Sequence, residues 1–233
     1  MRNISKSKFK IYRQDYTEAN DFYTLAIPKK QEVRQHLVIE QGYLCCYCMK
    51  RIKGTADDTN VEHNKPRSLY PELIFDYSNL LAACNRTVEP EPPKKRLYDP
   101  TEKNRINRHR TCDTAKGEKE ISKNPALHDV EVLIKYEIDG RISSSDSIFH
   151  KDLVEVLNLN KEDLVNARKS LVKTIGMGIE RKYPGKSPNE SQLRNELKRF
   201  LIPNSNGELP EFSGIAVFYL EKKLKRDNPN YSR

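Results

Sequence analysis

Four cysteines could be the ligands of a single zinc ion. Cys45 and Cys48 form a C-x-x-C pair, the spacing that lets two thiolates of one turn hold a tetrahedral ion. Cys84 and Cys112 follow singly, and they could complete a four-cysteine structural site. An ion bound in this way would fasten strands that are too short to form a core alone. The sequence therefore predicts structural zinc.

Alternatives to this ligand set stay open. His109 lies three residues before Cys112 and could replace one cysteine ligand. The cysteines could also be buried reduced thiols without a metal. A disulfide framework is disfavoured, because the count of five is odd. Cys46 is left over, and we expect it to be a packed thiol.

Between and after these cysteines lie side chains suited to hydrolysis. Hydrolysing a phosphodiester requires an activated water, a cation that balances charge, and in-line placement of both. His63 has the near-neutral pKa needed to take a proton from water. Asp113, at the start of an expected helix, offers an oxygen ligand for Mg²⁺ or Mn²⁺. Lys116, one turn later, would face the same side of that helix and contact a phosphate.

Each of these residues also has a purely structural interpretation. A lone histidine such as His63 is more often a packed residue than a catalyst. Asp113 could be only a helix cap, and Lys116 only a solvated charge. Asn79 ends the triplet YSN, which is a good context for a turn residue.

The order of these motifs resembles a known family. The strings EQGYLCCYCMKRI, VEHNKPRSLYPELIFDYSNLLAAC and CDTAKGEK, with YEIDGRI and LNLNKEDLVNAR downstream, resemble the PtuB-like HNH nucleases of Septu and retron-associated anti-phage systems. The resemblance runs over about residues 1–170 and is most specific over 40–117. A long segment between Cys84 and Cys112 departs from the compact HNH pattern.

The resemblance implies a fold, an activity and roles for two further residues. The fold would be a zinc-stabilised ββα-metal (HNH) core, and the activity that of a metal-dependent endonuclease cutting nucleic acid, with DNA the expected substrate. Glu62 would be the second oxygen ligand of the catalytic Mg²⁺ or Mn²⁺. The amide of Asn79 would brace the loop and orient the His63 ring.

The resemblance also implies partners. These are an ABC/SMC-like ATPase subunit of the PtuA-like type and, in retron settings, a reverse transcriptase with its RNA–DNA product. The chain would then be the effector of an antiviral defence system. Two competing functions remain: a non-catalytic zinc-stabilised module that binds nucleic acid or protein, and an RNA-cleaving enzyme with the same residues.

A basic, proline-rich segment interrupts the cysteine pattern. Residues 85–111 hold four prolines and eight basic against four acidic residues, a net charge of +4. We expect an irregular loop that contacts phosphates near the cleavage site. The expected contacts are Lys94, Lys95, Arg96, Arg105, Arg108 and Arg110.

The surrounding elements predict an α+β fold. A helix is expected from Pro28 to Gly42, and short strands over 60–63 and 79–83 precede a short helix after Cys112. The alternating stretch from Val132 and the turn signal Asp139-Gly140 predict a β-hairpin. Further helices are expected over 148–157, from a cap at Asn160 to Ile179, from Ser187-Pro188-Asn189-Glu190 to Leu201, and over Ile215 to Leu224.

Charge divides the chain into two regions. The 233 residues carry a net charge of +9, and residues 1–125 hold 24 basic and 17 acidic residues, a net of +7. We therefore expect a nuclease domain over 1–125 that meets an anionic partner. Residues 126–233, a hairpin followed by helices, are nearly neutral and are the expected docking surface for the ATPase.

Hydropathy excludes a membrane-spanning protein. The mean hydropathy is −0.83, and the longest apolar stretches, such as Leu80–Cys84, fall far short of the roughly 20 residues that span a bilayer. No apolar segment follows the basic N-terminal residues, so the expected compartment is the cytoplasm.

Overall fold

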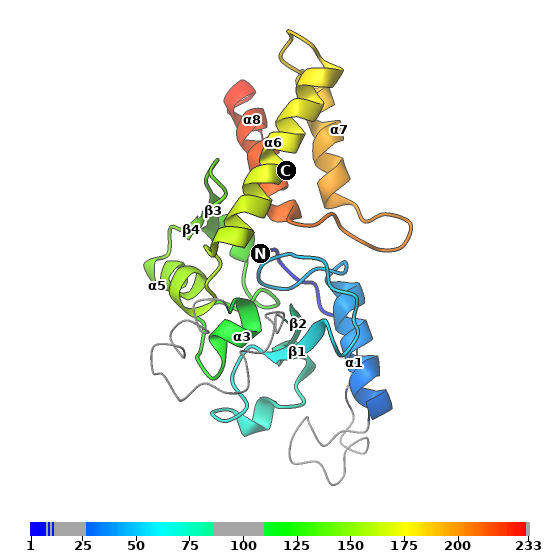
Figure 1. Cartoon of the computed structure of the whole chain (residues 1–233), viewed down its shortest axis with the longest axis vertical. Coiled ribbons are helices and arrows are strands. Elements are labelled where there is room, and N and C mark those ends of the chain that lie inside the picture. The colour runs from blue at the N-terminus through cyan, green and yellow to red at the C-terminus, as the bar shows by residue number, and fades with distance from the viewer. Residues whose placement is uncertain (8, 10, 12–26, 86–109, 232–233) are drawn as a thin grey trace, which may run out of the picture.

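The computed structural model describes residues 1–7, 9, 11, 27–85 and 110–231 and has a mixed α+β architecture (Figure 1). Two separate two-stranded antiparallel sheets lie among the helices of this described part. The sheet labelled β1 and β2 lies in the lower half of the molecule in Figure 1, and the three long helices α6, α7 and α8 form the upper end. No helix in the described ranges is long and apolar enough to cross a membrane.

The first layer is helix α1 (Ile27–Glu40) against the sheet of β1 (Thr59–His63) and β2 (Leu80–Cys84). Val33, Leu37 and Val38 are fully buried, as the apolar stripe predicted. The helix stops where Gly42 takes a φ of 60°, a conformation that glycine adopts without strain. The predicted helix and both strands are confirmed.

The strands pair antiparallel with Glu62 opposite Leu81 and His63 opposite Leu80. All five residues of β2 are buried, which agrees with its continuous run of apolar side chains. Helix α3 (Cys112–Lys116) packs against β2 and completes a β-β-α arrangement. The predicted short helix is therefore present, and it begins at Cys112.

The second sheet is the predicted hairpin of β3 (Ile134–Tyr136) and β4 (Ile142–Ser144). Its turn holds Gly140 at a φ of 92°. The prediction that the strand starts at Val132 is wrong, because that residue belongs to the short helix α4 (Val130–Leu133).

Helix α5 (Ser147–Lys151) continues into a π-helical turn over Asp152–Val156, which confirms the helix expected there. Helix α6 (Glu162–Lys182) follows, but Asn160 does not cap it. The Asn160 side chain instead accepts a hydrogen bond from the Ile142 amide at 2.8 Å and donates to the Ile142 carbonyl at 3.0 Å. Both ends of the Asn160 amide thus serve β4, and the cap position of α6 belongs to Lys161.

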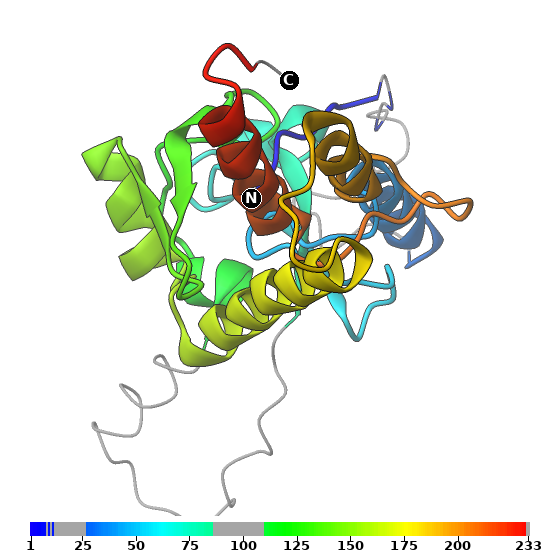
Figure 2. The same cartoon turned by 90° about the horizontal axis from the view of Figure 1, so that it is seen from above.

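Helix α7 (Glu190–Leu201) begins at a capping box, in which Asn189 and Gln192 exchange side-chain and backbone hydrogen bonds. Pro188 precedes this cap, so its expected place as first helical residue is wrong. Helix α8 (Ser213–Asp227) packs against α7 and α6 (Figure 2).

Two apolar cores follow from this packing. A small core lies between α6, α7 and α8 and includes Ile179, Leu197 and Leu220. The main core contains the cysteines and also residues from the second half of the chain, such as Leu157 and Ile215. The main core therefore crosses the expected division between residues 125 and 126.

Candidate metal centre and adjoining cavity

Four cysteines from three distant segments meet in the main core. The sulfur atoms of Cys45, Cys48, Cys84 and Cys112 all lie within 4.8 Å of one another, and all four side chains are buried. Sequence spacing alone left the pairing of Cys84 with Cys112 uncertain because 27 residues separate them. The end of β2 and the start of α3 bring the two together.

A tetrahedral zinc ion fits this cluster. With Zn–S bonds of about 2.3 Å, sulfur atoms of a tetrahedron lie roughly 3.8 Å apart. The Sγ atoms of Cys48 and Cys84 are 3.7 Å apart. Burial raises the pKa of the Cys112 thiol well above its usual value. Four buried cysteine sulfurs this close together are a donor set that a divalent ion would hold as thiolates.

A tight turn forms the first half of the cluster. The Cys45 carbonyl accepts a hydrogen bond from the Met49 amide at 3.0 Å, and the Cys45 amide donates to the Lys50 carbonyl at 2.9 Å. Met49 takes a φ of 64°, which closes the turn. We call residues 45–50 the cysteine turn.

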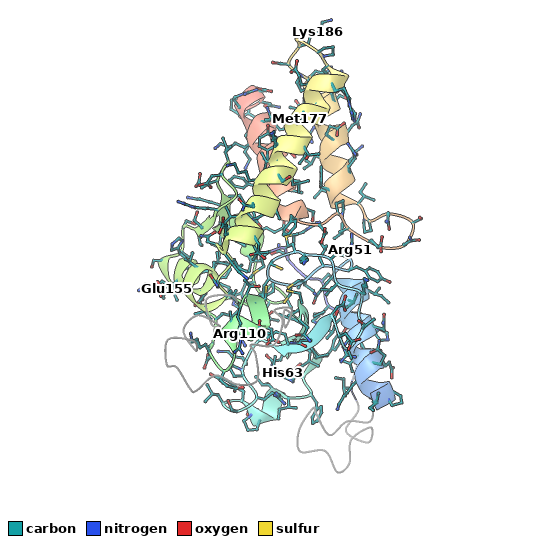
Figure 3. The ribbon with its side chains drawn as sticks, in the orientation of Figure 1. Arg51, His63, Arg110, Glu155, Met177 and Lys186 are labelled. Atoms are coloured by element: carbon teal, nitrogen blue, oxygen red, sulfur yellow. The ribbon has the colours of Figure 1, made fainter. Side chains whose placement is uncertain are left out.

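Cys46 is not one of the four clustered cysteines; its amide donates to the Ala82 carbonyl at 3.0 Å, and its side chain packs in the core beside Cys45. It is the packed thiol that was expected. His109, the alternative ligand, lies outside the described residues, as do the proposed phosphate contacts Lys94, Lys95, Arg96, Arg105 and Arg108. Arg110 is described and exposed, just before the cluster (Figure 3).

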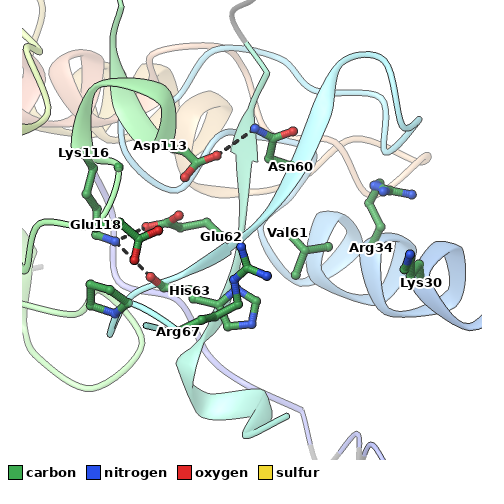
Figure 4. A pocket seen from close by; sticks show the side chains of 12 residues that line it. Lys30, Arg34, Asn60, Val61, Glu62, His63, Arg67, Asp113, Lys116 and Glu118 are labelled. Carbon is green, nitrogen blue, oxygen red and sulfur yellow. Dashed lines mark hydrogen bonds and ion pairs between the residues drawn. The ribbon is translucent and has the colours of Figure 1, made fainter. Parts of the chain in front are cut away.

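A cavity of about 360 Å³ opens beside the cluster, at the edge of the β1 strand. Its walls come from α1, β1, the loop after β1 and α3. Glu62, His63, Asp113 and Lys116 all line it, so the residues singled out in the sequence converge on one place, except Asn79 (Figure 4).

The Glu62 carboxylate is held from two sides. Its Oε1 atom accepts a hydrogen bond from the Tyr47 hydroxyl at 2.9 Å and forms an ion pair with the Lys116 ammonium at 2.8 Å. Burial raises the pKa of Glu62, the neighbouring Asp113 carboxylate adds to this, and the Lys116 charge opposes both. Two adjoining carboxylates in a cavity are what a divalent cation would neutralise.

The ammonium of Lys116 is buried and paired inside the protein, whereas a contact with a phosphate was expected. Its side chain is only 1% exposed, and its ammonium donates to the His63 carbonyl at 2.9 Å in addition to pairing with Glu62. The turn of α3 does put Lys116 and Asp113 on the cavity, as their spacing predicted. A phosphate contact, however, would have to compete with the Glu62 ion pair.

Asp113 is fixed by the strand opposite. Its Oδ2 atom accepts a hydrogen bond from the Asn60 side chain at 2.7 Å. Asp113 lies in the first turn of α3, where the cap position belongs to Thr111. The interpretation of Asp113 as only a helix cap is therefore wrong.

His63 is buried and electrically neutral at physiological pH. Burial lowers its pKa to about 4, and nearby Arg67 and Lys116 act in the same direction. Its Nε2 atom lies 3.0 Å from the Ile74 carbonyl oxygen. Because a carbonyl can only accept, Nε2 carries the proton and Nδ1 is the nitrogen able to act as a base.

Asn79 lies behind His63 and braces the loop between the strands. Its Oδ1 atom accepts from the Lys65 amide at 2.7 Å, and its Nδ2 atom donates to the carbonyls of Lys65 and Leu73 at 3.2 Å each. This loop carries the Ile74 carbonyl that meets the His63 ring. Asn79 is therefore placed to act on His63 through the loop.

Basic side chains occupy the opposite wall. Lys30 and Arg34 extend from α1, one helical turn apart, and Arg67 comes from the loop after β1 (Figure 4). The Arg34 Nε atom donates to the Thr59 carbonyl at 3.0 Å, which ties the helix to β1. The cavity thus has a cationic wall on the α1 side, while Lys116 adds a cation beside the carboxylates of Glu62 and Asp113.

Sequence reasoning missed several of these residues. Asn60 shares a strand face with Glu62 two positions later, and this alternation was the available signal. Lys30 and Arg34 have helical i, i+4 spacing, but nothing in the sequence says that α1 crosses β1 here. Tyr47 lies inside the cysteine motif, but nothing in the sequence indicated its contact with Glu62.

Comparison with protein-family models and with curated proteins finds no match to this chain. The geometry of the cluster and of the cavity therefore carries the functional argument.

Proposed function

We propose that this protein is a metal-dependent HNH endonuclease in which the cysteine cluster holds structural zinc and the adjoining cavity hydrolyses phosphodiester bonds. The single observation that carries the proposal is the convergence of Glu62, His63 and Asp113 on one cavity beside the cluster. The β1–β2–α3 order supports the ββα-metal fold implied by the sequence resemblance.

The chemistry follows from the residues of the cavity. Glu62 and Asp113 would hold one Mg²⁺ or Mn²⁺, which when bound neutralises charge on the phosphate and the leaving oxygen. His63, neutral at physiological pH, accepts the proton of the attacking water at Nδ1. The Ile74 carbonyl holds the ring in the required tautomer, and Asn79 holds the loop that carries this carbonyl.

The cationic wall supports nucleic acid as the substrate. Lys30, Arg34 and Arg67 line the same cavity as the carboxylates, where phosphates flanking the cleaved bond would lie. No base-reading element is recognisable, so we propose cleavage with low sequence specificity, of DNA in preference to RNA. We further propose that the chain acts as a defence effector with an ABC/SMC-like ATPase and, in retron settings, with a reverse transcriptase and its RNA–DNA product.

A cleavage assay on DNA and RNA tests the proposal. The wild type, with the ATPase partner present, should cut in Mg²⁺ or Mn²⁺ and stop when these ions are removed. His63→Ala should lose at least about a hundredfold in rate, the usual contribution of a general base. Equal cleavage by both proteins would overturn the role of His63, and no cleavage by either would leave a non-catalytic zinc module as the function.

A further inference from the structure

One side chain joins the cysteine cluster to the proposed catalytic carboxylate. Tyr47 lies inside the cysteine turn, directly before the ligand Cys48, and has no exposed surface. Its hydroxyl donates to Glu62 Oε1 at 2.9 Å. The same oxygen forms an ion pair with the ammonium of Lys116. Lys116 lies on α3, four residues after the ligand Cys112. Both donors to Glu62 are thus anchored next to cluster cysteines.

The two contacts leave Glu62 with a defined orientation. Because Tyr47 and Lys116 both engage Oε1, Oε2 is the oxygen that neither of them holds. A glutamate side chain is flexible, and fixing its carboxylate in advance lowers the entropy lost when it binds an ion. Hydrogen-bond partners of metal ligands commonly contribute 10- to 100-fold to metal affinity.

We infer that Tyr47 is a positioning residue which transmits the geometry of the cysteine cluster to Glu62, so that Glu62 presents Oε2 to a divalent cation in the cavity. This inference rests on the proposed function, because it takes Glu62 as a ligand of the catalytic ion. In this inference the cysteine cluster does more than hold short strands together. The position of the cysteine turn also sets the position of the catalytic carboxylate.

Tyr47 offers a cleaner test than Lys116. Removing the Lys116 ammonium would leave a buried carboxylate without its charge partner, which destabilises the fold directly. Tyr47→Phe removes one hydroxyl and keeps the ring that packs in the core. A matched control is Tyr136→Phe, since Tyr136 is also buried and its hydroxyl is hydrogen-bonded, at 2.9 Å, to the amino group of Met1 away from the cavity.

The experiment is a titration of the zinc-loaded full chain with Mn²⁺, followed by electron paramagnetic resonance. We expect Tyr47→Phe to raise the dissociation constant of the cavity site by about 10- to 100-fold, while Tyr136→Phe leaves it unchanged. Zinc content and the midpoint of thermal unfolding should match between the two variants. Cleavage by Tyr47→Phe should recover at high Mn²⁺, because the defect lies in binding the ion.

The outcomes separate the inference from the proposed function. If Tyr47→Phe binds Mn²⁺ as the wild type does while Glu62→Gln loses binding, the inference is overturned and the proposed function stands. Loss of zinc from Tyr47→Phe would also overturn it, since Tyr47 would then maintain the cluster itself. If Glu62→Gln binds Mn²⁺ as well as the wild type, the proposed function fails.

Discussion

At the scale of single residues, the burial of His63 decides what it can do. An exposed histidine is partly protonated near neutral pH, whereas the pKa of His63 is lowered to about 4 by burial and by nearby Arg67 and Lys116. The ring is therefore available as a base over the whole physiological range. The sequence predicted a base at this position but not the lowered pKa, which depends on the tertiary burial of the ring.

Burial of neutral His63 predicts a pH dependence of stability. The unfolded chain binds a proton at His63 near pH 6.5 and the folded chain only near pH 4. Between these values the unfolded state binds more protons, so the free energy of unfolding should fall as pH decreases, by up to about 3 kcal/mol. Above pH 6.5 this contribution is constant.

Urea unfolding of wild type and His63→Gln between pH 7 and pH 4 measures this effect. The variant should show a shallower decline over the window than the wild type. Identical slopes for wild type and His63→Gln would contradict the account.

The position of Lys116 beside Asp113 could be predicted from the sequence, but its burial could not. Helical spacing placed it beside Asp113, and that placement agrees with the structure. Its burial depends on the carboxylate that β1 presents to α3, and this contact spans 54 positions in the sequence. The ammonium of Lys116 is consequently an internal partner of Glu62 where a phosphate contact was expected.

At the scale of elements, the cysteine cluster joins the cysteine turn, β2 and α3. These pieces are too short to be stable separately, and α3 has only five residues. Bound zinc would supply the stability that such short elements cannot gain from their own packing. The elements themselves were predicted well from turn signals and apolar runs, because those signals are local.

Replacing a cluster cysteine should therefore remove zinc and destabilise the fold. We expect Cys84→Ser to lose the metal and to lower the thermal midpoint substantially, because binding free energy of structural zinc is folding free energy. Cys46→Ser is the control, as Cys46 is equally buried but outside the cluster. Native mass spectrometry would count the zinc; retention of zinc by Cys84→Ser would contradict the assigned ligands.

A second prediction at the scale of elements concerns the basic side chains of helix α1. The double variant Lys30→Glu and Arg34→Glu should weaken binding of duplex DNA and reduce the slope of log affinity against log salt by about 2. The control is Lys169→Glu with Lys173→Glu, an exposed pair of the same i, i+4 spacing on α6. Fluorescence anisotropy at several salt concentrations measures both, and equal slopes for the two double variants would count against the cationic wall.

At the scale of the whole molecule, the region around the cysteine cluster and the helical region share one core. Leu157 and Ile215 pack in the same cluster as the cysteines, and the Cys112 amide donates to the Leu157 carbonyl at 2.9 Å. Composition predicted two regions of different charge, and it could not predict this shared core because contacts between distant segments leave no periodic signal. Asn160 is a similar case: its local sequence predicted a helix cap, but its side chain is hydrogen-bonded to Ile142 of β4.

The shared core changes how partner docking should be tested. Deleting residues 180–233 would remove Ile215 from the main core, so loss of binding would report unfolding as well as docking. Met177 on α6 is 64% exposed (Figure 3), and Met177→Glu should reduce co-purification with the ATPase without lowering stability. Ile138→Glu, in the exposed β3–β4 turn, is the matched control; equal reduction by both variants would contradict docking on the helices.

The central claim is that two different metal sites adjoin in this fold, sulfur ligands in one and oxygen ligands in the other. Anomalous diffraction from crystals soaked in Mn²⁺, collected at the zinc and manganese edges, tests it most directly. We predict a zinc peak among the four cysteine sulfurs and a manganese peak between the carboxylates of Glu62 and Asp113. A cavity without manganese, while zinc fills the cysteine cluster, would contradict the account.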